Sequence, residues 1–587
     1  MATKKSKTAK KAKTAKSKNT KKTASKKTAK KKEIAPDEIE TKNVQVADEN
    51  DTAQDDALEA STGNETLESA PFSYDELPYE SFPYSQTHPP QLATIATIFG
   101  LETPDFDKMR VLELGCAAGG NIIPLAHDYP DAEFVGIDLS KEQIDKGKKQ
   151  IKDMKLKNIK LDHLSIADIK DQYGTFDYII CHGVFSWVPD EIAEKILNVA
   201  HKSLSPEGLA IISYNCLPGW SAVSSVRDMM IYHTRKFDSL TEKAEQAKRL
   251  VDFLHKNCDT ESPYKGILEN EKKVLGRTRN DYIAHEYLED QNTQYYFYEF
   301  IEKAQKHDLQ YVGDTSLATM YYGNMPDEAA KQLQVVNDMI TQEQYMDFIR
   351  NRRFRYSILT HANRKINRKI TPEAIEKMYV VSTYKPEGPI TNDDKPMTFV
   401  RPDKKMSFKL STPVQKLAFA KFGENAGNPV KISEMIDFVA ERLDATDADA
   451  KDAVRATILD SVAQLALKGM IKLTLEGPRW TLKISEKPRV SDHALYLAGL
   501  DQQGWVVNGL RSKVSVTLIT KFIISQLDGT QTIDQVVDKL IAEMEKQNWK
   551  IRADKKVVED EEFIRKAAER LVRNTIAEAR RRCMLVA

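Results

Sequence analysis

Residues 113–120 combine an acid with three glycines at the point where an apolar run gives way to a helix-like segment. The spacing is Glu113-x-Gly115-x-x-x-Gly119-Gly120. Glycine lets a backbone approach a ligand closely because no Cβ stands in the way. The free N–H groups at the start of a following helix can bind an anion. The stretch therefore predicts a cofactor site, for a dinucleotide, a nucleoside triphosphate or a ligand without phosphate.

The glycine spacing disfavours both phosphate ligands. A dinucleotide fingerprint, G-x-G-x-x-G, needs a second glycine that residues 116–118 do not provide. A P-loop needs Gly-Lys-Ser or Gly-Lys-Thr, and neither follows Gly120. Glu113 would repel a polyanion but suits a cation. S-adenosylmethionine (AdoMet), which carries an ammonium and a sulfonium and no phosphate, fits this pattern.

Polar residues follow the next apolar runs in the order that an AdoMet site requires. Asp138 closes "GIDLS", where a carboxylate can accept both ribose hydroxyls, and "SIAD" is placed to line the adenine. Asp138 alone could cap a helix, and His182 alone could be a buried core histidine. The series as a whole favours an AdoMet-dependent methyltransferase. The predicted cofactor-binding residues are Tyr84, His88, Glu113, Gly115, Cys116, Gly119, Asp138, Leu139, Ala167, Asp168, His182 and Gly183.

The elements that position these residues alternate between strands and helices from residue 109 onward. We expect strands at 109–115, 133–140, 159–169, 176–183 and 208–215. Apolar strands separated by amphipathic helices predict a parallel sheet covered on both faces. Ligands of such sheets bind beyond the carboxyl ends of the strands. The fold class is therefore α/β, with a Rossmann-like domain.

The whole chain, 587 residues, is long enough for three or four domains. The expected parts are the AdoMet-binding core at 71–216, a helical insertion or lid at 217–290, the end of the sheet at 291–325, a helical region and linker at 326–403, a winged-helix-like domain at 404–487 and a mostly helical domain at 488–587. The winged-helix prediction rests on helices followed by two strands around a Gly-Pro turn.

The N-terminal residues 1–70 differ from the rest in charge, although the net charge of the chain is zero. Residues 1–32 hold fifteen lysines and no acid, and residues 33–69 hold twelve acids and a single lysine. With so few large apolar residues, we expect a disordered tail. Its lysine block could bind nucleic acid or another polyanion in a salt-dependent way, could itself be methylated, or could be inert.

Cysteine usage and hydropathy indicate the compartment. The five cysteines are scattered, with no pair at metal-ligand spacing, so we expect reduced thiols and no metal site. No apolar core follows the N-terminal lysines, as a secretory signal would require. No stretch approaches the apolar length of a membrane span. A cytoplasmic protein is expected.

Residues 105–216 resemble a class I methyltransferase domain by these motifs. The segments "PYESFPYSQTHPPQLATIATIFGL", "CHGVFSWVPDE", "SYNCLPGW" and "HEYLEDQNTQYYFYEFIEKAQKHDLQYVGD" resemble methyltransferases that bear a methyltransferase regulatory domain. That group includes rickettsial-type protein lysine methyltransferases, which modify an outer-membrane surface protein. The resemblance covers residues 72–587 and is diffuse beyond 400. It implies a protein-lysine acceptor, a homodimer and a large C-terminal part that handles the substrate.

Aromatic residues near the expected pocket are the predicted acceptor side. Tyr79 and Tyr84 precede the first strand, in a segment that could cover the cofactor or serve as an ordinary hydrophobic strap. Trp187 and Tyr214 follow the fourth strand and end the fifth, where they could hold a lysine stem through their π faces or simply pack in the core. Tyr214, Asn215 and His182 are the predicted catalytic residues, although methyl transfer needs no obligatory general base.

Two other functions remain open from the sequence. A small-molecule or nucleic-acid methyltransferase is one, although "CHGV" stands at 181–184 where nucleobase amino-methylases carry an Asn/Asp-Pro-Pro-aromatic motif. The other is a nucleic-acid-binding protein that acts through the lysine-rich tail.

Overall fold

The computed structural model describes residues 80–586, apart from 425–426, 502, 554–555 and 558–559. These residues all belong to one unit, Ser69–Ala587. Tyr79 and the expected tail at 1–70 lie outside the described residues.

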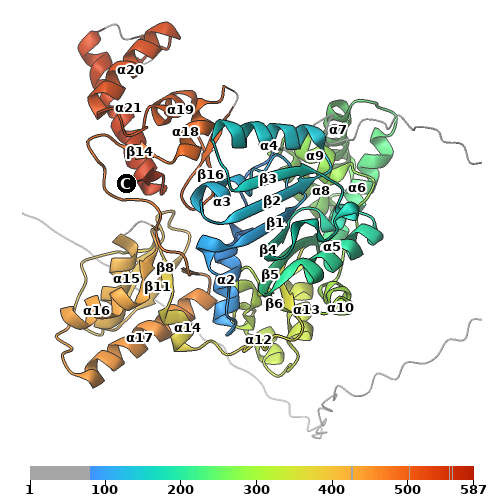
Figure 1. Cartoon of the computed structure of the whole chain (residues 1–587), viewed down its shortest axis with the longest axis horizontal. Coiled ribbons are helices and arrows are strands. Elements are labelled where there is room, and N and C mark those ends of the chain that lie inside the picture. The colour runs from blue at the N-terminus through green and yellow to red at the C-terminus, as the bar shows by residue number, and fades with distance from the viewer. Residues whose placement is uncertain (1–79, 425–426, 502, 554–555, 558–559, 587) are drawn as a thin grey trace, which may run out of the picture. The chain divides into compact units, whose positions relative to one another are not determined.

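A mixed seven-stranded sheet forms the centre of the fold. Its strands are β1 (Arg110–Leu114), β2 (Glu133–Asp138), β3 (Ile159–His163), β4 (Phe176–Cys181), β5 (Leu204–Asn215), β6 (Leu309–Asp314) and β7 (Phe354–His361). Their order is β3-β2-β1-β4-β5-β7-β6 (Figure 1). The first five strands in this order are parallel, which confirms the predicted Rossmann-like fold, and β7 is antiparallel to both of its neighbours.

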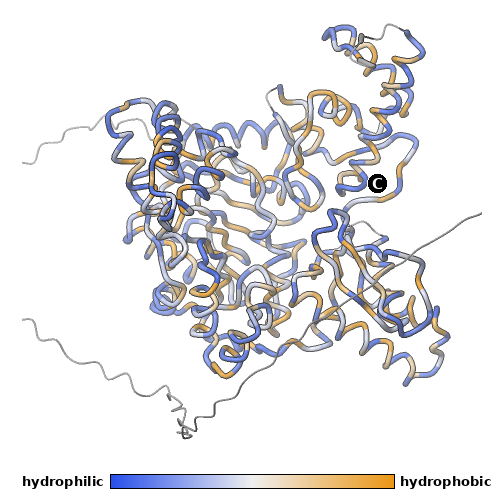
Figure 2. Tube along the Cα trace, turned by 180° about the vertical axis from the view of Figure 1, so that it is seen from behind, coloured by the Kyte–Doolittle hydropathy of each residue, from blue (hydrophilic) through white to orange (hydrophobic). Residues whose placement is uncertain are grey.

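Helices cover both faces of the sheet, because successive residues of a strand point to opposite sides. Ile180 of β4 packs with α2 (Pro89–Ile98), α3 (Ile123–Asp128) and α4 (Lys141–Asp153). Its neighbour Ile179 packs with α5 (Asp190–Ser203) and α10 (Phe297–Lys306). In Figure 2, hydrophilic residues (blue) and hydrophobic residues (orange) alternate along the helices, as expected for amphipathic segments. Apolar runs such as "YIIC" are therefore buried on both sides.

Strand β7 corrects the prediction that residues 326–361 are helical. Helices α12 (Asp327–Leu333) and α13 (Met339–Arg350) do form, but the chain then returns into the sheet between β5 and β6. Residue 325 is therefore not the end of the sheet. Period-two apolar residues at Phe354, Tyr356 and Ile358 match a strand, but charged Arg355 between them obscures the pattern.

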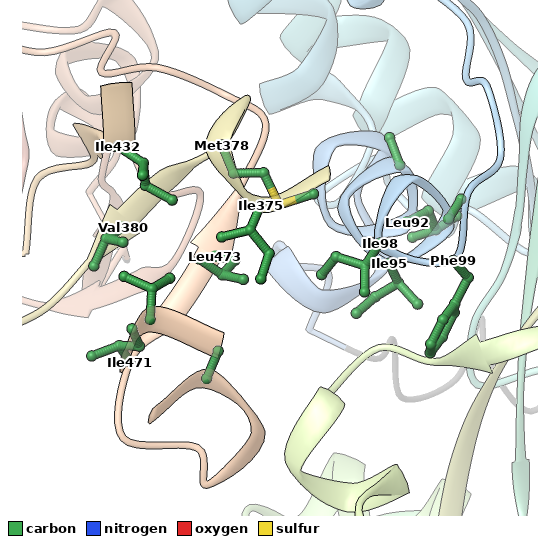
Figure 3. Packing of buried hydrophobic residues seen from close by; sticks show 14 of the residues in the cluster. Leu92, Ile95, Ile98, Phe99, Ile375, Met378, Val380, Ile432, Ile471 and Leu473 are labelled. Carbon is green, nitrogen blue, oxygen red and sulfur yellow. The ribbon is translucent and has the colours of Figure 1, made fainter. Parts of the chain in front are cut away.

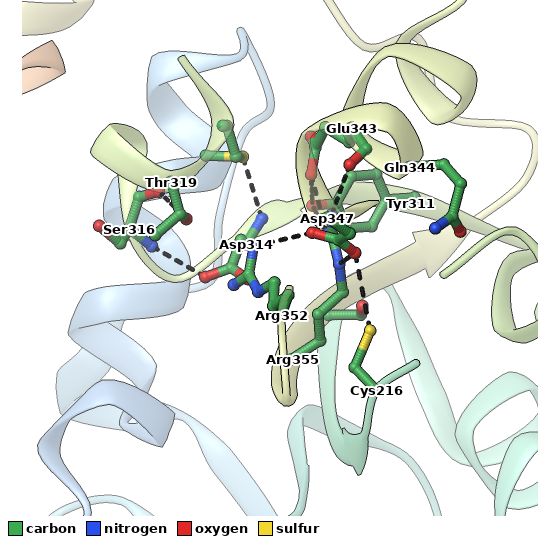
Figure 4. Close-up of polar contacts among 12 residues, drawn as sticks. Cys216, Tyr311, Asp314, Ser316, Thr319, Glu343, Gln344, Asp347, Arg352 and Arg355 are labelled. Atoms are coloured by element: carbon green, nitrogen blue, oxygen red, sulfur yellow. Dashed lines mark hydrogen bonds and ion pairs between the residues drawn. The ribbon is translucent and has the colours of Figure 1, made fainter. Parts of the chain in front are cut away.

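A buried ion cluster anchors β7 to its surroundings (Figure 4). Arg355 is fully buried, and its Nε and Nη2 donate to the two Asp347 carboxylate oxygens at 2.7 and 3.0 Å. Its Nη1 donates to Glu343 Oε2 at 2.8 Å. Arg352 donates to Asp314 Oδ2 at 2.5 Å, so the cluster links α13 to β6 as well. Paired charges of this kind are compatible with burial, whereas a lone charge is not.

The insertion after β5 is helical, as expected. It consists of α6 (Trp220–Thr234), α7 (Leu240–Asn257), α8 (Pro263–Leu275) and α9 (Asn280–Tyr287). These helices enclose a small core of their own, which includes Val226, Ala247 and Leu268. A lid function for this insertion stays a prediction.

The next segment packs against helix α2 of the methyltransferase domain. It contains α14 (Pro372–Glu376), β8 (Tyr379–Val381), β9 (Lys385–Pro386), β10 (Met397–Val400), β11 (Ser407–Leu410), α15 (Pro413–Glu424), β12 (Val430–Lys431), α16 (Ile432–Arg442), α17 (Ala448–Leu467) and β13 (Lys472–Thr474). Figure 3 shows Ile375 and Met378 facing Ile95 and Ile98 of α2. One hydrophobic cluster thus joins α2 to the β12-β8-β13 sheet.

The second strand expected after the Gly-Pro turn does not form among the described residues. Only β13 precedes the turn, and the stretch behind it contacts the C-terminal part of the chain, where Thr481 donates its N–H to the Leu585 carbonyl at 2.9 Å. That part contains α18 (Asp492–Gly499), α19 (Leu518–Ser525), α20 (Ile533–Lys546) and α21 (Glu561–Arg581), with the strand pairs β14–β19 (Arg489–Val490, Leu585–Val586), β15–β16 (Trp505–Val507, Lys513–Ser515) and β17–β18 (Arg552–Ala553, Lys556–Val557).

Within the part of the chain that the structure describes, no helix is both long and apolar enough to cross a lipid bilayer.

Candidate active site

The glycine turn after β1 is shaped by close contacts on both sides. Gly115 has φ +72°, and a Cβ there would lie 2.4 Å from Val184 Cγ2. A Cβ on Gly120 would lie 2.3 Å from the backbone carbonyl carbon of Ser81. The N–H of Gly115 also donates to the Ile137 carbonyl at 2.9 Å. Only glycine fits these two positions without displacing neighbouring chain.

Asp138 lies at the end of β2, beside the turn. Its Oδ2 accepts from the Ala117 N–H at 2.8 Å and its Oδ1 from the Ser140 N–H at 2.8 Å. A carboxylate oxygen can accept more than one hydrogen bond, as acceptance of ribose hydroxyls requires. The N-cap of α4 is Ser140, whose hydroxyl accepts from the Gln143 N–H. The helix-cap alternative for Asp138 is therefore wrong.

Glu113 is buried beneath the turn and contacts Asn121. Its Oε1 accepts from Asn121 Nδ2 at 2.6 Å, and its Oε2 has no hydrogen-bond partner among the described residues. Burial raises the pKa of the Glu113 carboxyl to about 8, and the charge of Asp138 adds to the rise. The arrangement provides a buried acid with one oxygen free, which fits a cationic ligand such as the AdoMet ammonium.

Asn121 connects the turn to the segment before α2. Its Oδ1 accepts from the Tyr84 N–H at 2.7 Å and lies 2.8 Å from His88 Nε2. Its Nδ2 also donates to the Thr87 hydroxyl at 3.1 Å. Burial lowers the pKa of His88 to about 3, so the ring is neutral. His88 thus supports Asn121 from behind. Asn121 directly follows the glycine motif, but it is not among the residues predicted for the site.

The outer wall of the site is more open. Leu139, which follows Asp138, is 51% exposed, and Ala167 and Asp168 are exposed in the 3-10 turn η3 (Ile166–Asp168). A Cβ on Gly183 would meet no atom within 4 Å. An exposed apolar residue and open space at these strand ends fit an adenosine group. Cys116 is buried, and burial raises the pKa of its thiol well above the usual range, so the thiol is uncharged, and its predicted contact with the cofactor stays a prediction.

Four rings gather at the carboxyl ends of β4 and β5, and we name them the aromatic cluster: Tyr84, His182, Phe354 and Tyr356. The His182 ring lies 4.1 Å from Tyr84 and 5.4 Å from Tyr356, centroid to centroid. The Phe354 ring lies 6.2 Å from His182 and 5.1 Å from Tyr356. Phe354 and Tyr356 are only partly buried. Sequence reasoning missed both because they belong to β7.

His182 is held in a neutral, apolar setting. Its Nδ1 lies 2.8 Å from the Ser213 hydroxyl, which also accepts from the Gly183 N–H at 2.9 Å. Burial lowers the pKa of His182 to about 4. A neutral ring does not repel a positively charged acceptor.

The residues predicted for the acceptor side separate in the structure. Tyr214 lies in the core on the opposite face, stacked on Phe300 at 4.1 Å, with its hydroxyl 3.1 Å from that of Ser357. This geometry favours its packing role. Asn215 is buried, and neither atom of its side-chain amide has a partner among the described residues. Trp187 packs on the insertion, 6.5 Å from the Trp220 ring.

Three family models match the chain. A methyltransferase domain matches residues 105–305, a "predicted methyltransferase regulatory domain" matches 279–361, and a PKMT C-terminal winged helix domain matches 486–584. The winged helix is thus matched in the segment expected to be a helical domain. Whether 404–487 is a second such domain stays a prediction.

Relatives and solved structures agree with these models. RP789 of Rickettsia prowazekii is 38% identical over 505 residues, 85% of this chain and 91% of the relative. RP028 of the same organism is 46% identical over 40% of this chain and 94% of its own. The structure of PKMT2 from Rickettsia typhi in complex with AdoHcy is 35% identical, covers 87% of this chain and all of that one, and has a TM-score of 0.79.

The chain belongs to this family of AdoMet-dependent methyltransferases. AdoMet is accordingly the cofactor, and the glycine turn, Asp138 and the free Glu113 oxygen suit it.

Proposed function

We propose that the protein is a protein-lysine N-methyltransferase that acts on a surface or outer-membrane-type protein. The observation that carries the lysine assignment is the aromatic cluster, which lies at the strand ends next to the glycine turn. Its rings are uncharged and partly exposed, and aromatic faces attract an ammonium while they pack along an aliphatic stem. The similarity to PKMT2 supports the same acceptor class.

The residues of the proposed site divide into two groups. Asp138, Glu113 and the backbone of the glycine turn would bind AdoMet, which supplies a methyl group on an already activated sulfonium when it is bound. The aromatic cluster would hold the lysine side chain. Its apolar surroundings lower the pKa of an amine and so favour the nucleophilic neutral form. Positioning accounts for much of the rate in such a transfer.

The free amide of Asn215 is a further proposed contact for the acceptor. A buried amide without partners loses hydrogen-bonding free energy unless a ligand supplies them. Asn215 is the last residue of β5, and its backbone position lies opposite Phe354 of β7 in the sheet. Tyr214 and Trp187 have contacts elsewhere, so their roles toward the acceptor, and that of Tyr79, stay predictions.

The direct test is transfer of labelled methyl groups from AdoMet into candidate surface proteins, followed by mapping of the modified residues by mass spectrometry. Label on lysine side chains is expected. Phe354→Ala should slow transfer about tenfold, because an aromatic contact to an ammonium and its lost packing together amount to about 1–2 kcal/mol. Phe563→Ala, which removes an exposed ring on α21, is the matched control. Label confined to small molecules or nucleic acid would contradict the proposal.

Homodimer formation, action in the cytoplasm and binding of polyanions by residues 1–32 remain predictions from the sequence.

A further inference from the structure

Residues 80–88, named the strap here, lie between the winged helix domain and the cofactor turn. The strap has no regular secondary structure at residues 80–84 and then forms the 3-10 turn η1 (Ser85–Thr87). Side chains along it contact different partners. Glu80 and Phe82 contact the domain at 486–584, whereas Ser81 and Tyr84 contact the glycine turn and the aromatic cluster.

The contacts on the winged helix side come from the β15–β16 hairpin. Trp505 donates its indole N–H to Glu80 Oε1 at 2.5 Å, and Lys513 donates to Glu80 Oε2 at 2.9 Å. The Lys513 ammonium also lies 4.6 Å from the centroid of the Phe82 ring. Phe82 itself packs on the hydrophobic core of the C-terminal domain. Burial acts to raise the pKa of Glu80, but its hydrogen bonds from Lys513 and Trp505 outweigh this and the pKa is lowered.

The contacts on the other side are to the residues that form the cofactor turn. The Ser81 hydroxyl accepts from the Gly120 N–H at 2.8 Å. The Tyr84 N–H donates to Asn121 Oδ1, and the Tyr84 ring lies 4.1 Å from that of His182. A shift of the strap would therefore disturb both the turn and the aromatic cluster.

The hairpin is itself fixed to the methyltransferase domain at its tip. Arg511, between β15 and β16, is buried and forms an ion pair at 3.0 Å with Asp128, the last residue of α3. Its Nη2 donates to the Tyr129 hydroxyl at 3.1 Å, and it also pairs with Glu476. The β15–β16 hairpin, which carries Trp505 and Lys513, is thus held in place by contacts with residues at the end of α3.

We infer that Trp505 and Lys513 of the winged helix domain are positioning residues for the AdoMet site. They hold Glu80 and Phe82 and thereby keep Ser81 and Tyr84 over the turn. The C-terminal domain accordingly completes the cofactor site in addition to any role toward an acceptor. This inference concerns cofactor binding alone, so its failure and that of the lysine assignment can be told apart.

The test is a double-mutant cycle on the contact between Glu80 and Lys513 in the full chain, with AdoHcy affinity measured by calorimetry. Glu80→Gln and Lys513→Met should each weaken binding about fivefold to tenfold, mainly through faster dissociation. The double variant should bind within about twofold of the weaker single variant, because both changes remove the same contact. Trp505→Phe, which keeps a ring and loses the N–H, should also weaken binding.

The control is the exposed pair of Glu562 and Lys566 on α21, joined at 2.6 Å. Glu562→Gln and Lys566→Met should leave AdoHcy affinity unchanged. The KM for AdoMet should rise in the strap variants with little change in kcat, and their unfolding midpoints without ligand should stay within about 2 °C of the wild type, as for a pair that is not fully buried. Wild-type affinity in Lys513→Met and Trp505→Phe, strictly additive losses, or losses that follow a lower midpoint would each overturn the inference.

Discussion

Two buried acids of this protein, Glu113 and Glu343, differ in what they face. Glu343 receives a hydrogen bond from the Arg355 guanidinium inside the ion cluster. Glu113 receives one from the uncharged amide of Asn121 instead. In each acid the other carboxylate oxygen has no hydrogen-bond partner among the described residues, so the two differ in the charge of the partner they do have. Burial raises the pKa of both; Arg355 opposes the rise at Glu343, whereas the charge of Asp138 adds to it at Glu113. A buried acid paired with arginine stabilises a fold, while one without a cation leaves room for a cationic ligand.

The largest expected effect follows from removal of Arg355, the cation that pairs with Glu343 in the ion cluster. Arg355→Met removes the ion-pair partner of buried Glu343 and leaves buried Asp347 with the longer pair to Arg352 at 3.6 Å. We expect the free energy of unfolding to fall by about 3–5 kcal/mol. Urea denaturation followed by circular dichroism measures it. Arg573→Met, which removes an exposed pair with Glu569, should cost less than about 1 kcal/mol. Equal losses in the two variants would contradict the distinction drawn here.

Substitutions around Glu113 and the glycine turn should change the affinity for AdoHcy more than the free energy of unfolding. Asp138→Ala removes the proposed ribose acceptor and the partner of the Ala117 N–H. We expect the Kd for AdoHcy to rise about 100-fold or more, since two hydrogen bonds to a charged group are lost. Calorimetry provides the measurement, with the exposed Asp145 of α4 changed to Ala as the control. Retained affinity in Asp138→Ala would place the ribose elsewhere.

The raised pKa of Glu113 gives a pH dependence with a definite sign. The ammonium group of AdoHcy favours the ionised acid, so AdoHcy affinity should rise as pH increases from about 6 to about 8, by up to about tenfold per unit, and then level off. Glu113→Gln should remove this component, and the difference between the two proteins cancels the titration of the ligand itself. In ligand-free protein the same shift predicts stability that falls from about pH 4.5 to pH 8, because the folded state retains a proton that the unfolded chain has released. Parallel pH profiles for wild type and variant would exclude Glu113 as the titrating group.

The smallest effect is expected for Tyr214→Phe. Loss of the hydrogen bond to Ser357 should cost about 1 kcal/mol of stability. The methyl-transfer rate should change less than about twofold, because the hydroxyl lies in the core away from the aromatic cluster. Single-turnover kinetics with labelled AdoMet would reveal a slower step if Tyr214 took part after all.

The residues at the carboxyl ends of the strands could be predicted from the sequence, because each is recognised from its immediate neighbours in the chain. Glu113, the glycines and Asp138 each follow or lie within an apolar run, and the parallel order of β1 to β5 brings them to one edge of the sheet. Asn121 was missed for a different reason. Its role depends on four partners, and three of them, Tyr84, Thr87 and His88, lie 33 to 37 residues before it, so the contacts cannot be inferred from spacing.

Strand β7 shows where local patterns fail. Arg355 occupies a buried position that a strand pattern would fill with an apolar residue, and only its pairing with Asp347 and Glu343 makes that tolerable. The preceding helix α13 is polar and regular, so the helical pattern extends easily across the boundary. Because residues 354–361 were predicted to be helical, Phe354 and Tyr356 were not predicted as residues of the site. The contacts of Trp505 and Lys513 with Glu80 could not be predicted either, because no sequence pattern around Glu80 or around the hairpin indicates a partner so far away in the chain.

The contact between Glu80 and Trp505 also bears on the synthesis of the chain, because 425 residues separate the two partners. At a translation rate of about 5–20 residues per second, the ribosome adds Trp505 about 20–85 seconds after Glu80. The Rossmann-like domain can fold during that interval, but its N-terminal strap has no hairpin to contact. A nascent chain would therefore lack these contacts to its strap until the winged helix domain has emerged, so that full cofactor affinity requires synthesis to have passed that domain.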